Sequence, residues 1–215
     1  MPCWQYLDIP YQAYVPLQWA EDLPQMLALG HDRLAYFDQP VHLVGFSMGA
    51  YLAAQIALQD PGKVQSLTII GNNCQALPDA ELKQRNSLLV ALKQGGFKAM
   101  GNKQLISMLH PDNAANSVVI NIIREMEQDL GMATLASQLR ATSQRKNLIP
   151  ALAQAKFTTH FMAGKHDHLA TELQLHQARQ QIAGSTLTLI AQAGHMLPIE
   201  QPKQLAEALA SSLIQ

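Results

Sequence analysis

The sequence predicts an α/β protein in which helices flank a mostly parallel sheet and a helical segment is inserted between two strands. Before residue 75 and after residue 150, short apolar runs of strand length alternate with longer segments of helical periodicity. Between these positions the apolar residues follow helical spacing alone. Such alternation favours a parallel sheet with helices on both faces. We therefore predict a core made of residues 1–74 and 151–215, with residues 75–150 forming a helical cap.

The first third of the chain is predicted to alternate strands with helices. Its strand segments are short and rich in β-branched or aromatic residues, and its helical segments place apolar residues three or four positions apart. Gly30 is expected to interrupt or kink the first helix, and Asp60-Pro61-Gly62 ends the second. The predicted segments are Trp4–Ile9 (strand), 18–36 (helix), Val41–Val44 (strand), Ala50–Leu58 (helix) and Val64–Ile70 (strand).

The predicted cap is a row of about four helices with no strand between them. Leucine, isoleucine and methionine recur in it at helical spacing, and glycine and proline separate the helices. A helical block between two strands of an α/β sheet is typical of a cap or lid. Its methionines could form an adaptable apolar binding surface or fill the core of the block, and the sequence leaves both readings open.

The last third of the chain returns to strands alternating with helices. A charged and histidine-rich loop, Lys165-His166-Asp167-His168, follows its first strand, and a glycine-histidine loop, 193–198, follows its second. The predicted segments are Phe157–Ala163 (strand), 171–182 (helix), Ser185–Ile190 (strand) and 201–213 (helix).

A glycine-flanked serine, Gly45-Phe46-Ser47-Met48-Gly49, joins a predicted strand directly to a predicted helix. Strand, G-x-S-x-G and helix together are the context of a nucleophile elbow, in which a strained turn holds the serine Oγ above the sheet. Glycines at 45 and 49 would let strand and helix approach closely. The Met48 amide, at the helix N-terminus, would point toward a developing oxyanion. The alternative is a chance glycine-flanked serine on a βα turn.

An acid and a base are predicted to join this serine. A serine hydroxyl is a poor nucleophile until a base removes its proton and an acid orients that base. Ser47, Asp167 and His195 each follow a predicted strand, and the carboxyl ends of parallel strands open on one edge of a sheet. We therefore expect the three side chains to meet there.

Asparagines 72 and 73 also follow a strand, at a position where some triads place their acid. An amide cannot stabilise an imidazolium as a carboxylate does, so Asp167 keeps the role of acid. His166 and His168 flank Asp167, but consecutive residues point in different directions and no third ligand is near in sequence. We therefore expect no metal and no cofactor.

Charge and composition exclude several classes of protein. Lys+Arg number 15 against 16 Asp+Glu, which gives no electrostatic reason to bind nucleic acid or an anionic membrane. An apolar content of 48% with scattered charges is typical of a globular chain. Cys3 and Cys74 do not make a disulfide framework, and no signal segment or membrane-length apolar run is visible. We expect a soluble, cytoplasmic protein.

The motifs in combination resemble the α/β-hydrolase fold superfamily. They are the elbow 45–49, the strand end 164–167, and the loop 193–196 with Glu200 and Pro202 before a terminal helix. The chain is most similar to the carboxylesterase, haloperoxidase-like and C–C hydrolase branches, from Trp4 to its C-terminus.

The resemblance implies a role for each residue of the predicted site. Ser47 would be the nucleophile, His195 the base and Asp167 the acid, and the Met48 amide would be one oxyanion donor. It also implies a helical cap at residues 75–150, no cofactor, and a small-molecule substrate.

One departure from the family pattern is expected to matter. Family members carry further strands before the segment that Trp4–Ile9 resembles, and one of these ends in a His-Gly-type loop that supplies the second oxyanion amide. Without that strand, an edge beside Val41–Val44 would be unpaired. Three explanations stay open: the start is truncated, Trp4–Ile9 moves into the vacant slot with the Pro10–Tyr14 loop replacing the oxyanion loop, or a second chain covers the edge as in a homodimer.

The leading hypothesis for function is a serine hydrolase that acts on a small, partly apolar ester through an acyl-enzyme. Two alternatives remain: C–C bond hydrolysis or a lyase-type reaction on the same triad, and a non-catalytic hydrolase-fold protein that binds a ligand or partner.

Overall fold

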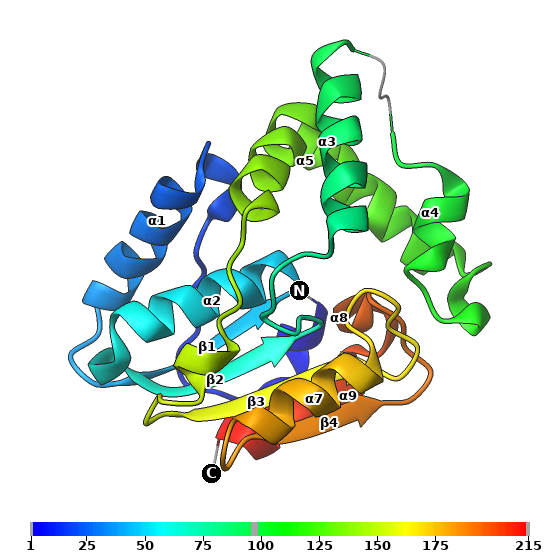
Figure 1. Ribbon diagram of the computed structural model, residues 1–215. Helices are drawn as coiled ribbons and strands as arrows, with labels where there is room; N and C mark the ends of the chain where they lie inside the picture. Colours follow the sequence, from blue (N-terminus) through cyan, green and yellow to red (C-terminus); the bar gives the residue numbers. More distant parts are fainter. Residues whose placement is uncertain (1, 96–98, 214–215) are drawn as a thin grey trace.

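A computed structural model of the chain describes residues 2–95 and 99–213. In this part of the chain a four-stranded, fully parallel sheet forms the centre, with strands in the order β1-β2-β3-β4 (Figure 1). The predicted α/β fold class is therefore confirmed. The strands are β1 (Val41–Phe46), β2 (Val64–Ile70), β3 (Thr158–Gly164) and β4 (Thr186–Ile190).

Alternate residues of each strand are buried on opposite faces of the sheet, because successive side chains of a strand point to opposite sides. Leu67 and Ile69 of β2 pack on one face with residues of α2, α6 and α7. Ile70 of β2 and Met162 of β3 pack on the other with α9 and the N-terminal segment. Helices on both faces of a parallel sheet are what the alternation of strand and helix segments predicted. The flanking helices are α1 (Leu23–Ala35), α2 (Met48–Gln59), α6 (Ile149–Leu152), α7 (Glu172–Gln181), α8 (Leu197–Glu200) and α9 (Pro202–Leu213).

The prediction of a strand at Trp4–Ile9 is wrong. Pro2–Tyr6 form a short 3-10 helix, η1, and the residues after it are irregular. Trp4 and Ile9 instead pack into the apolar cluster that α9 forms over the sheet. Pro2 and Pro10, which lie on either side of this segment, lack the N–H that a ladder needs, and Leu7 is buried without strand pairing.

The strand β1 is an edge of the sheet within the described residues, since it pairs with β2 alone. The hypothesis that Trp4–Ile9 fills the slot beside β1 is therefore wrong. The side chains of Val41–Val44 are partly exposed, in contrast to the almost fully buried β2.

The prediction that Gly30 interrupts the first helix is also wrong, because α1 runs through it without a break. A Cβ at this position would lie 2.2 Å from Ile56 Cδ1 of α2. The glycine therefore permits close packing of α1 on α2, which outweighs its low helix propensity.

Residues 79–143 contribute the helices α3 (Asp79–Lys93), α4 (Asn102–Ser107) and α5 (Ser117–Ser143). We call these three helices and their connections the helical block. Gly131 has a φ of 70° and divides α5 into two helices. Figure 1 shows the helical block above the layer formed by the sheet and α2. Short 3-10 turns occur at η2 (Leu17–Trp19), η3 (Pro61–Lys63) and η4 (Pro111–Asn113).

None of the helices in the described ranges is both long and apolar enough to cross a membrane.

Candidate active site

Ser47, Asp167 and His195 meet at the edge of the sheet where the strands end. His195 Nε2 lies 3.0 Å from Ser47 Oγ, and His195 Nδ1 lies 2.9 Å from Asp167 Oδ2. The three residues follow β1, β3 and β4, so the parallel topology brings together side chains from distant parts of the sequence. The structure thus brings the three residues into one hydrogen-bonded chain.

The position of Asp167 determines which nitrogen of His195 carries the proton. Asp167 Oδ2 accepts a hydrogen bond, so Nδ1 of His195 carries the proton and donates it. Nε2 is then free to accept the hydrogen of the Ser47 hydroxyl. Asp167 Oδ1 accepts the N–H groups of Leu169 and Ala170 at 2.8 and 2.9 Å, which fixes the carboxylate. This is the arrangement by which a base is made ready to take a proton from a serine.

The turn at Ser47 is strained. Its φ of 51° and ψ of −116° lie where side-chain-bearing residues rarely occur. Its N–H donates to Ile70 O of β2 at 2.8 Å, which ties the turn to the neighbouring strand. The strain is thus held by the surrounding sheet, and the Oγ is presented to His195.

The two glycines of the elbow have unequal roles. A Cβ at Gly45 would lie 2.4 Å from Gly49 O and 2.5 Å from Ala50 Cα, so no side chain fits there. A Cβ at Gly49 would come no closer than 4.0 Å, to Leu17 Cδ1. The expectation that both glycines are needed for close approach is therefore correct for position 45 and wrong for position 49.

Gly71 follows β2 and lies beside Asp167 and His195. Its φ is 61°, and a Cβ there would lie 3.4 Å from both Asp167 Oδ2 and His195 Cε1. The absence of a side chain at this position leaves room for the acid and the imidazole.

Asn72 contacts the serine turn, a role that was not predicted for it. Its side chain is buried, and its Nδ2 donates to Ser47 O at 2.9 Å while its Oδ1 accepts the Cys74 N–H at 2.7 Å. Asn73 Oδ1 accepts the Gln75 N–H. Both amides thus organise backbone, and Asn72 holds the serine turn. Asparagine directly after a strand is a known turn signal, and this was the signal available in the sequence.

Met48 is the first residue of α2, and the first amides of a helix have no acceptor within it. Such amides carry the positive end of the helix dipole and suit an anion. In the Pro10–Tyr14 loop, Tyr14 packs edge-on against Trp4 and Tyr11 packs edge-on against Phe37.

His166 and His168, which flank Asp167, have different surroundings. The His166 ring lies edge-on to the His110 ring with centroids 4.3 Å apart, and the backbone N–H of His166 donates to Ala193 O at 2.9 Å. His168 is exposed. Within the described part of the chain, no group of three or more His, Cys, Asp or Glu side chains could hold a metal ion.

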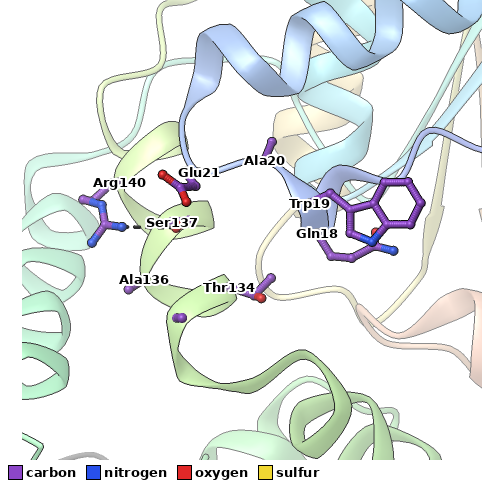
Figure 2. A pocket seen from close by; sticks show the side chains of 9 residues that line it. Gln18, Trp19, Ala20, Glu21, Thr134, Ala136, Ser137 and Arg140 are labelled. Atoms are coloured by element: carbon purple, nitrogen blue, oxygen red, sulfur yellow. Dashed lines mark hydrogen bonds between the residues drawn. The ribbon is translucent and has the colours of Figure 1, made fainter.

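A groove of about 500 Å³ lies between η2 and α5 (Figure 2). Trp19, Glu21 and Arg140 are among the residues that line it, and Arg140 donates to Ser137 Oγ at 3.1 Å. None of Ser47, Asp167 and His195 lines this groove.

Comparison with solved structures shows the same fold at low sequence identity. A thermophilic esterase from Thermogutta terrifontis is 21% identical with a TM-score of 0.79, covering 96% of this chain and 74% of that chain. An enol-lactonase from Burkholderia xenovorans LB400 is 21% identical with a TM-score of 0.76, covering 90% of this chain and 74% of that one. A bromoperoxidase from Bacillus anthracis is 18% identical with a TM-score of 0.72, covering 91% and 75%.

No curated protein matches the chain. The family model described as "Alpha/beta hydrolase family" matches residues 10–208, which is most of the sequence. This chain belongs to the alpha/beta hydrolase family.

Proposed function

We propose that this protein is a serine hydrolase that cleaves small, partly apolar carboxylic esters. The observation that carries the proposal is the continuous hydrogen-bonded chain from Ser47 Oγ through His195 to Asp167, with spacings of 3.0 and 2.9 Å. Membership of the alpha/beta hydrolase family and an esterase of the same fold are consistent with it.

In the proposed reaction, Ser47 Oγ attacks the ester carbonyl carbon while His195 Nε2 takes the hydroxyl proton. The carbonyl oxygen becomes an oxyanion, for which the Met48 N–H is the proposed donor. The C–O bond to the alcohol then breaks, and the imidazolium gives its proton to the leaving alkoxide. Water attacks the acyl-enzyme through the same base, which releases the acid and restores the serine.

An apolar cluster beside the reacting groups supports an apolar substrate. Leu105, Leu109, Val119 and Ile123 of the helical block pack with Met196, and Phe46 lies against this cluster. Phe46 precedes the nucleophile and Met196 follows the base, and the Phe46 ring lies 5.3 Å from the His195 ring. We therefore propose residues 75–150 as a cap that surrounds the acyl or alcohol group with aliphatic side chains.

Hydrolysis of p-nitrophenyl acetate and butyrate by wild type, Ser47→Ala and Ser87→Ala tests the proposal. Ser87 is an exposed serine on α3, so Ser87→Ala controls for a general effect of removing a hydroxyl. We expect turnover in wild type and Ser87→Ala, and a loss of roughly 10³-fold or more in Ser47→Ala. Equal rates in wild type and Ser47→Ala would refute the proposal.

Labelling with a fluorophosphonate probe gives a second test that needs no particular ester. An activated serine attacks the phosphorus and is labelled, whereas an inert hydroxyl is not. We expect label on Ser47 in wild type and none after Ser47→Ala. Label without turnover of any ester would support the same nucleophile acting on another substrate class, such as a C–C bond.

A further inference from the structure

Glu200, the last residue of α8, has a buried carboxylate that connects two segments far apart in the sequence. Oε1 accepts the Gly194 N–H at 2.8 Å, directly beside His195. Oε2 accepts the His110 N–H at 2.7 Å and Asn113 Nδ2 at 3.0 Å, both from the helical block. Within the described residues no cationic side chain forms an ion pair with this carboxylate. The three N–H donors therefore compensate for its removal from water.

The same two segments also touch directly. Met108 O accepts the His195 N–H at 2.7 Å and the Met196 N–H at 3.4 Å. A Cβ at Gly194 would lie 2.6 Å from Met108 O and 2.8 Å from His110 N, so the loop has no room for a side chain there. Residues 108–113 of the helical block are thus laid closely against the backbone that carries the imidazole.

We propose that Glu200 is a positioning residue, which couples residues 108–113 of the helical block to the His195 loop and so sets the imidazole relative to Ser47. The inference rests on the proposed function, because it names the residue that places the proposed base. His195 Nε2 must stay within hydrogen-bond reach of Ser47 Oγ, and an error of about 1 Å in such a position costs on the order of a hundredfold in rate.

Glu200→Gln tests this role with the smallest change in shape, because it replaces the carboxylate by an amide. Glutamine has nearly the same volume but only one acceptor oxygen, so its NH₂ must face an N–H on one of the two sides. Two donors meet Oε2 and one meets Oε1, so the amide oxygen is expected to turn toward His110 and Asn113. The Gly194 N–H then loses its acceptor, and the His195 loop is the side that loosens.

Steady-state kinetics of Glu200→Gln test this, with Glu207→Gln as the matched control because Glu207 is an exposed carboxylate on α9. We expect kcat to fall about tenfold to a hundredfold in Glu200→Gln, with KM changed less than about threefold. Glu207→Gln should match wild type in both. A folded Glu200→Gln protein with the wild-type kcat would overturn the proposal, as would a loss confined to KM.

A compensating change makes the test specific for orientation. Asn113→Asp places a carboxylate where it can accept from the amide NH₂ of a glutamine at 200, which turns the amide oxygen back to the Gly194 N–H. We expect the kcat of the double variant Glu200→Gln/Asn113→Asp to be at least threefold higher than that of Glu200→Gln alone. Strictly additive losses would contradict the coupling.

The proton between His195 Nδ1 and Asp167 Oδ2 gives a readout that needs no substrate. Protons in buried imidazole–carboxylate hydrogen bonds resonate far downfield of amide protons, and Asp167→Asn assigns the signal by removing it. We expect the resonance in wild type and Glu207→Gln, and a shifted or broadened one in Glu200→Gln. An unchanged resonance in folded Glu200→Gln would overturn the proposal, whereas absent Ser47-dependent turnover with a shifted resonance would refute only the proposed function.

Hydrogen exchange in the wild-type protein covers the case in which Glu200→Gln does not fold. One carboxylate holds the amides of His110 and Gly194, so their opening should be a single event. We expect both amides, with that of His195, to share one opening free energy over a denaturant series. Independent exchange of the Gly194 and His110 amides would contradict the proposed coupling.

Discussion

His195 Nδ1 lies 2.9 Å from Asp167 Oδ2, and both side chains are more than nine-tenths buried. The opposite oxygen of the carboxylate is held by two backbone N–H groups, so it cannot turn away from the imidazole without breaking them. In the proposed reaction this relationship keeps the proton on Nδ1 and leaves Nε2 unprotonated toward Ser47.

Asp167→Asn should therefore lower kcat by about 10³- to 10⁴-fold while leaving the fold intact. The amide can present its NH₂ to Nδ1, which moves the imidazole proton to Nε2 and removes the base that Ser47 needs. The measurement is ester turnover at neutral pH, with Asp129→Asn as the control because Asp129 is exposed on α5. A loss below tenfold in a well-folded Asp167→Asn protein would contradict the assigned role.

Gly45→Ala and Gly49→Ala should have opposite outcomes although they share one motif. The first places a Cβ 2.4 Å from Gly49 O, so the strand and helix must separate, at a cost of about 1–3 kcal/mol or more. The second meets only Leu17 at 4.0 Å and gains helix propensity, so stability should stay level or rise by up to about 1 kcal/mol. Urea unfolding of both variants checks this, and a Gly45→Ala protein no less stable than Gly49→Ala would contradict the difference between the two positions.

The strands of the core could be predicted from the sequence because their apolar residues are also the residues that the sheet buries. The runs predicted as strands, 41–44, 64–70, 157–163 and 185–190, are short, rich in apolar or β-branched residues, and bounded by glycine, proline or polar residues, and all four overlap the observed strands. The order of the loops then sufficed to bring Ser47, Asp167 and His195 together, because a parallel sheet gathers strand ends at one edge.

The parts that could not be predicted depend on tertiary packing. Trp4–Ile9 has the aromatic, apolar composition of a strand, but its first residues belong to the 3-10 helix Pro2–Tyr6, and Trp4 and Ile9 pack against a cluster that includes residues of α9. Gly30 reads as a helix breaker until Ile56 is known to lie against it. Asn72 and Glu200 act through backbone groups of residues far away in the chain, and a periodic pattern carries no such information.

Asn72→Ala should lower both stability and activity, whereas Asn73→Ala should lower stability alone. The first change removes the donor to Ser47 O and leaves the buried Cys74 N–H without an acceptor, for a loss of about 1–3 kcal/mol. Asn73 Oδ1 accepts the Gln75 N–H, and among the described residues its side chain makes no hydrogen bond to the serine turn. Urea unfolding and kcat on the same samples separate the two effects. A wild-type kcat in Asn72→Ala would show that the strained turn is held without this amide.

His160 should make the protein less stable in mildly acidic solution. It lies on β3, almost fully buried, and its Nδ1 is 2.8 Å from Thr186 Oγ1. Burial, and secondarily the charge of nearby His42, holds the pKa of His160 below the usual 6.5. Between the lowered pKa of the folded state and the usual 6.5, the unfolded chain therefore binds more protons than the folded one. The contribution of neutral His160 to the free energy of unfolding is fully present above pH 6.5 and is lost as the pH falls from there through the lowered pKa.

His160→Asn keeps a hydrogen-bonding group near Thr186 and removes the titration. We expect its free energy of unfolding to fall less between pH 7 and pH 5 than that of wild type, measured by urea unfolding at a series of pH values. His176→Asn is the control, because His176 is nearly half exposed on α7. A pH dependence in His160→Asn equal to that of wild type would mean that His160 does not produce the acid sensitivity.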